Sequence, residues 1–151
     1  MLSRLSWPNL TEDERQGTSP RSTQYNCIAW AAGTDQEWWE PDDPRYTPHG
    51  GPTTWPEGVP HVFTVEACVQ VFATIGYEPC GTAELEPGFE KVALYADEFG
   101  DPTHAARQLE SGLWTSKMGD LEDTDHATVH SVEGPLYGRA VAFLRRPRRT
   151  H

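Results

Sequence analysis

The chain has 151 residues, of which 36% are hydrophobic and 11% aromatic, and its formal net charge is −11. A chain of this length and composition is expected to form one globular domain that buries about two thirds of its unfolded surface. No stretch approaches the roughly 18 apolar residues that span a membrane, and the N-terminus lacks the apolar core of a signal peptide. The sequence therefore predicts a cytoplasmic protein without a membrane partner.

The charge is spread unevenly along the chain. All 23 acidic residues precede Arg139, together with seven basic ones, so residues 1–138 carry 7 − 23 = −16. A body with this charge repels nucleic acid and suits a basic partner. The last thirteen residues hold five arginines and no acid. We therefore predict a single domain over residues 1–144, followed by a basic, disordered tail over 145–151.

The first predicted element is a short buried helix over residues 26–33. Polar residues precede a run of small and apolar residues, and Gly33 ends this run. Cys27 falls in its first turn, where the positive end of the helix dipole favours a thiolate and lowers the pKa of the thiol. The alternative is a structural cysteine in the core, because cysteine is among the most often buried residue types. The chain has three cysteines, at positions 27, 68 and 80, and their spacing fits neither a disulfide framework nor a zinc motif.

A long loop follows this helix and reaches about residue 61. It contains three tryptophans, which argue against disorder: Trp38, Trp39 and Trp55. We expect them to border a cleft that holds Cys27; the alternative is that they fill one side of the core.

A second helix is predicted over residues 64–76 from its apolar stripe, with Thr64 as its cap and Gly76 at its end. The rest of the chain is predicted to form four strands and one late helix, in the order strand 90–96, strand 103–109, strand 113–118, helix 123–132 and strand 137–144. Helices followed by antiparallel strands predict an α+β domain, with the cysteine-bearing helix packed on the sheet.

A thiol nucleophile needs a base, and His104 is the predicted partner of Cys27 because it begins a strand in the middle of the sheet. With a three-residue turn at 110–112, Ser116 lies on the same face of the sheet as His104; with a two-residue turn, Lys117 takes that place. Ser116, or an acid within residues 120–125, is therefore predicted to orient the imidazole.

In amide hydrolysis, we expect the oxyanion of the transition state to be stabilised by the Cys27 backbone N–H and by the side chain of Gln24 or Asn26. Trp30 and Trp55 are further candidates for contact with a substrate. On the predicted late helix, Asp123, His126 and His130 share one side. Such residues can hold a metal, but a helix cap and ordinary surface histidines are the favoured interpretation, so no metal and no cofactor are predicted.

Several short motifs, in a fixed order, resemble a bacterial domain family of unknown activity. They are Tyr25–Gly33, Lys91–Tyr95, Thr103–Gln108 and Trp114–Gly119, followed by Asp123 and His126. The chain departs from the family where Met118 and the Asp123–His126 segment replace the more usual Leu and Ile. The order of cysteine helix, histidine strand and further strand also resembles papain-like cysteine peptidases and the smaller NlpC-type amidases, which implies a papain-like fold.

Two functions remain open at this point. The first is a cysteine-dependent amide hydrolase or acyltransferase acting on a peptide or protein, with Cys27 as nucleophile, His104 as base and Ser116 as orienting group. The second is a non-catalytic module of the immunity type, which uses the tryptophan-rich loop and the acidic surface to hold a protein partner. The acidic charge favours a basic partner. The sequence does not indicate an oligomeric state.

Overall fold

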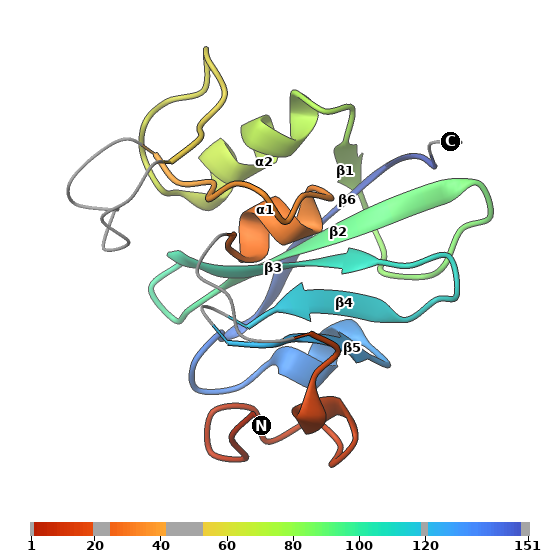
Figure 1. Cartoon of the computed structure of the whole chain (residues 1–151). Helices are drawn as coiled ribbons and strands as arrows, with labels where there is room; N and C mark the ends of the chain where they lie inside the picture. Colours follow the sequence, from red (N-terminus) through yellow and green to blue (C-terminus); the bar gives the residue numbers. More distant parts are fainter. Residues whose placement is uncertain (1, 20–24, 42–52, 119–120, 149–151) are drawn as a thin grey trace.

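The computed structural model of the chain describes residues 2–19, 25–41, 53–118 and 121–148. Its main element is one six-stranded antiparallel sheet with the strand order β1-β6-β2-β3-β4-β5 (Figure 1). The strands are β1 (Glu78–Cys80), β2 (Phe89–Ala96), β3 (Pro102–Gln108), β4 (Trp114–Lys117), β5 (Asp123–His126) and β6 (Arg139–Pro147). The helices are α1 (Cys27–Ala31), α2 (Val65–Ala73) and the 3-10 turns η1 (Glu14–Gln16) and η2 (Val129–Val132).

The prediction of an α+β papain-like fold is therefore wrong: the described residues are mainly β, and the two α-helices have only five and nine residues. One reason is the early end of α1, which stops at Ala31 before Gly33 turns the chain with φ +97°. The second helix is also shorter than predicted, although Thr64 caps it through Ala67 N–H as expected.

The predicted late helix over residues 123–132 is also wrong. Its first four residues form β5, which pairs with β4, and only residues 129–132 make a 3-10 turn, capped by Thr128. Pairing with β4 outweighs the helical spacing of the polar residues, because the backbone N–H and C=O groups of β5 form hydrogen bonds with those of β4. Asp123 and His126 consequently point to opposite faces of the sheet. The predicted grouping of these two residues with His130 on one side of a helix is therefore not formed.

The two faces of the sheet are covered differently. Against the first, called here the helix face, α1 and α2 pack on Val92, Leu94, Ala105 and Leu144. The second, called here the cap face, carries a cluster that includes Tyr95, Trp114, Met118 and Tyr137. Residues from the N-terminal segment and from η2 cover this cluster. Neighbouring residues of one strand thus belong to separate hydrophobic clusters.

The last strand also differs from the prediction of a strand over residues 137–144, because β6 spans Arg139–Pro147. Arg145 Nη1 lies 2.6 Å from Glu86 Oε2, and Arg146 Nε lies 2.6 Å from Glu90 Oε1. These ion pairs hold the arginines to the β2 side of the sheet. None of the helices within the described ranges is both long and apolar enough to cross a membrane.

Candidate functional site

Cys27 is the first residue of α1, and the residue before it, Asn26, is the cap of that helix. The Asn26 side-chain oxygen accepts hydrogen bonds from the backbone N–H groups of Ala29 and Trp39, each at 3.1 Å. Its amide nitrogen donates to the Trp39 carbonyl at 2.8 Å. The polar atoms of Asn26 are therefore occupied in joining α1 to the following loop, whereas the sequence predicted contact with a reaction intermediate.

The thiol of Cys27 lies against the apolar cluster of the helix face, beside the backbone of Ala105. Burial raises its pKa to about 11, and the nearby Glu40 carboxylate acts in the same direction. The sequence predicted a lowered pKa from the helix dipole. A five-residue helix supplies too weak a field to offset the loss of hydration, and the thiol stays protonated near neutral pH.

His104 lies on the other side of the sheet. Its ring stacks on Tyr137 with centroids 4.1 Å apart and lies 5.3 Å from the ring of Tyr95, both members of the cap-face cluster. Because successive side chains of a strand point to opposite faces, His104 points away from the side on which its neighbour Ala105 meets Cys27. The fold therefore does not bring the predicted nucleophile and base together.

Of the two registers that the sequence left open, the one with a three-residue turn at 110–112 is formed, since Arg107 pairs with Thr115 and Gln108 with Trp114. This register places Ser116 on the face of His104, and the Ser116 Oγ lies 2.9 Å from His104 Nε2. The contact that the sequence predicted is formed, but inside the cap-face core, where both residues are buried.

The contact continues to His126, whose Nε2 lies 2.8 Å from Ser116 Oγ. The Nδ1 of His126 lies 2.8 Å from the Thr128 carbonyl, which can only accept, so Nδ1 carries the proton in the neutral ring. Ser116 then donates to His126 Nε2 and accepts from His104 Nε2–H. This leaves His104 Nδ1 as a buried acceptor without a hydrogen-bond partner among the described residues.

The Thr128 carbonyl thus determines which atom donates in each hydrogen bond that links His104, Ser116 and His126. Burial lowers the pKa of His104 well below its ordinary value, and His126 acts in the same direction. Burial also lowers the pKa of His126, partly offset by the Thr128 carbonyl. Both rings are held neutral, which suits a structural hydrogen-bond chain.

The remaining predicted residues lie on the helix face or outside the described ranges. Trp30 Nε1 donates to Thr115 Oγ1 at 3.1 Å, and Trp55 Nε1 donates to the Pro60 carbonyl at 3.0 Å. Trp39 and Trp55 pack against the same cluster as Cys27, so these two lie on the side of the sheet where the sequence placed them. Gln24 lies outside the described residues.

A polar cluster beneath α1 was not predicted. Tyr25 Oη donates to Asp123 Oδ2 at 2.8 Å, and Lys117 Nζ lies 5.2 Å from the centre of the Tyr25 ring. Burial raises the pKa of Tyr25 to about 12, and burial likewise raises the pKa of Asp123, although the Tyr25 hydrogen bond opposes this. Lys117 and Asp123 are cross-strand partners, a relation that the sequence shows only once residue 123 is assigned to a strand.

This cluster connects the start of α1 to β4 and β5. Within the described ranges, no group of three or more His, Cys, Asp or Glu side chains could hold a metal ion.

Alkylation of Cys27 is expected to be slow. In the folded protein near pH 7.5, iodoacetamide should label Cys27 about a hundredfold more slowly than in the unfolded chain, because a thiol with a pKa near 11 is almost entirely protonated. The partly exposed Cys80 serves as the internal control, with peptide mass spectrometry as the readout. His104→Ala should leave the Cys27 rate unchanged while lowering stability by about 3 kcal/mol. A slower Cys27 reaction in this variant would instead support the predicted pairing of Cys27 with His104.

A family model described as a domain of unknown function, DUF7689, matches residues 16–145. No curated protein and no solved structure matches the chain.

Proposed function

The chain belongs to the DUF7689 family, and we propose that it is a non-catalytic binding module that holds a basic peptide or protein. The partner is proposed to lie on the layer formed by residues 25–41 and 53–76, which comprises α1, α2 and the described parts of the loop between them and is called here the acidic layer. A binding role is preferred to hydrolysis because Cys27 packs against the helix-face cluster, whereas His104 stacks on Tyr137 of the cap-face cluster.

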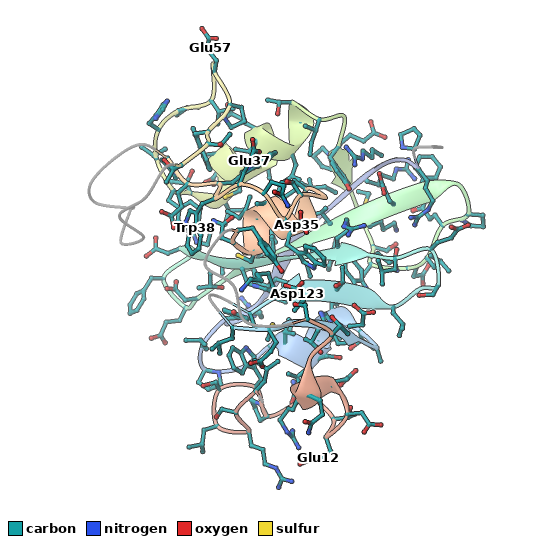
Figure 2. The ribbon with its side chains drawn as sticks, in the orientation of Figure 1. Glu12, Asp35, Glu37, Trp38, Glu57 and Asp123 are labelled. Carbon is teal, nitrogen blue, oxygen red and sulfur yellow. The ribbon has the colours of Figure 1, made fainter. Side chains whose placement is uncertain are left out.

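The observation that carries the proposal is the charge of this layer. In the sequence, the segment 25–76 contains one basic residue, Arg45, and seven acidic ones: Asp35, Glu37, Glu40, Asp42, Asp43, Glu57 and Glu66. Four of these acids are exposed in the structure: Asp35, Glu37, Glu57 and Glu66. Figure 2 shows Asp35 and Glu37 beside α1 and Glu57 at the tip of the following loop. A surface of this kind attracts and orients a cationic partner.

Basic side chains elsewhere do little to offset these acids at the surface. Four of them are buried: Arg15, Lys91, Lys117 and Arg146. Lys91 and Arg146 are paired with Glu86 and Glu90, respectively. These four buried side chains are therefore not exposed beside the acids of the acidic layer.

Aromatic rings lie among these acids. Trp39 and Trp55 are half-buried, and Trp39 Nε1 donates to Glu37 Oε2 at 2.8 Å. Indole rings attract lysine and arginine side chains, and this attraction adds to the attraction of the carboxylates. A lysine- or arginine-rich segment is the chemistry that fits both features.

Binding of a fluorescein-labelled peptide of eight lysines tests the proposal. We expect binding at low salt that weakens as salt is added, because exposed charges are screened within about 10 Å at 0.1 M. The triple variant Asp35→Asn, Glu37→Gln, Glu57→Gln should weaken binding about tenfold, from three exposed pairs of roughly 0.5 kcal/mol each. Fluorescence anisotropy measures the change.

A matched control separates a local site from net charge. The variant Glu98→Gln, Asp101→Asn, Glu110→Gln removes the same charge from exposed positions in the β2–β3 and β3–β4 turns. It should weaken binding less than twofold. An equal loss in both triple variants, or no binding by the wild type, would reject the acidic layer as the binding surface.

A further inference from the structure

Residues 2–15, called here the N-terminal cap, form a closed loop of their own. The Leu2 N–H donates to the Arg15 carbonyl at 2.7 Å and joins the two ends. Inside the loop, Trp7 N–H donates to the Ser3 carbonyl and Arg15 N–H to the Thr11 carbonyl. The Arg15 guanidinium bonds to the Leu10 carbonyl and to Glu12. Compact loops with joined ends keep their shape through internal contacts of this kind.

The cap lies outside the matched family domain, which begins at residue 16. Yet its three large apolar side chains enter the cap-face core: Leu2, Trp7 and Leu10 are 1%, 3% and 3% exposed. The Trp7 ring lies 5.7 Å from the ring of Tyr137. The cap therefore covers an apolar sheet face with a few large anchors, which is how a bound peptide covers a groove.

Among the described residues, three polar contacts join the cap to one part of the domain. Asn9 Nδ2 donates to the His130 carbonyl at 2.9 Å, and the Ala127 N–H donates to Glu14 Oε2 at 2.9 Å. Thr124 Oγ1 donates to the Glu14 carbonyl. All three contacts go to the segment from β5 to η2, so the cap is held at one end of the sheet rather than paired along a strand.

We infer that the cap face is a peptide-docking surface, occupied in this structure by the chain's own residues 2–15, and that the same segment of a second copy can take its place. The ligand chemistry is a peptide with large apolar residues at the spacing of Leu2, Trp7 and Leu10. A second copy fits because the cap closes on itself through Leu2 and Arg15, and an identical element makes identical contacts when it is exchanged.

The test adds the cap as a separate molecule. A fluorescein-labelled peptide of residues 1–17 is titrated into the full chain carrying Trp7→Ala and Leu10→Ala, whose own cap has lost two anchors. We expect saturable binding to this variant, and binding to the wild type at least tenfold weaker because its site is filled. The control peptide carries the same two alanines and should not bind.

Each other outcome overturns the inference. Equal binding to both chains places the peptide elsewhere, and no binding to a folded variant makes the cap an inseparable part of the core. If the variant does not fold, hydrogen exchange of the wild-type chain decides. The hydrogen-bonded amides of Leu2, Trp7 and Arg15 should then exchange at least a hundredfold faster than those in the centre of β2 and β3. Exchange at the rate of β2 and β3 would show that the cap opens only when the whole domain unfolds.

Discussion

Replacing Gly138 by alanine is expected to destabilise the protein by about 3 kcal/mol or more. Gly138 has φ +67°, and a Cβ at this position would lie 2.0 Å from the carbonyl oxygen of Ala96 and 2.8 Å from its carbonyl carbon. These are backbone atoms of β2 and cannot swing aside as a flexible side chain would. The two strands must therefore separate where Ala96 pairs with Arg139.

The effect should spread to the cap-face core, because the neighbouring residue Tyr137 stacks on His104. Gly88→Ala is the matched control: Gly88 has φ +83°, but nothing lies within 4 Å of an added Cβ. It should cost only about 1 kcal/mol for the left-handed backbone. Urea unfolding followed by circular dichroism measures both variants. Similar losses in the two would mean that the close approach to Ala96 contributes nothing.

Acid is expected to destabilise the fold between pH 7 and pH 5. His104 and His126 have lowered pKa values in the folded protein, so the unfolded chain binds more protons as the pH falls below about 6.5. The contribution of these groups to the free energy of unfolding is thus fully present above about pH 6.5. It is lost as the pH falls from there towards the pKa values of the folded protein. A histidine that stays uncharged over this interval contributes about 2 kcal/mol to the loss.

The surroundings of the two rings offer little compensation. His104 faces the rings of Tyr95 and Tyr137, and the carboxylates that act on His126, from Glu14 and Asp125, do not reverse the effect of burial. Asp123, whose pKa is raised, acts in the opposite direction in more acidic solution, so the measurement should stay above about pH 5.

Two variants test this account by urea unfolding at several pH values. His104→Phe keeps a ring against Tyr137 and should show a shallower pH dependence than the wild type. Ser116→Ala removes the shared partner of both imidazoles and should cost about 2–3 kcal/mol at pH 7. A wild-type stability that stays constant from pH 7 to pH 5 would contradict the buried, neutral state of both histidines.

Local chemistry was enough to predict several parts of this molecule. The turn at residues 110–112 sets the register between β3 and β4, and alternation along the strands then places Ser116 beside His104. The start of α1 at Cys27 and the cap of α2 at Thr64 follow from residues next to them in the chain. These features depend on contacts between neighbours or across one short turn, so a single sequence contains the information for them.

Three other features depend on packing between distant segments. Residues 123–126 have helical spacing, but the open edge of β4 makes them a strand. Cys27 and His104 are 77 positions apart, and alternation along β3 does not reveal which of its faces α1 will cover. That choice follows from the cap, which fills the cap face with Leu2, Trp7 and Leu10 and leaves the helix face to α1 and α2. Burial of both faces, a property of the whole chain, therefore separates the cysteine from the histidine.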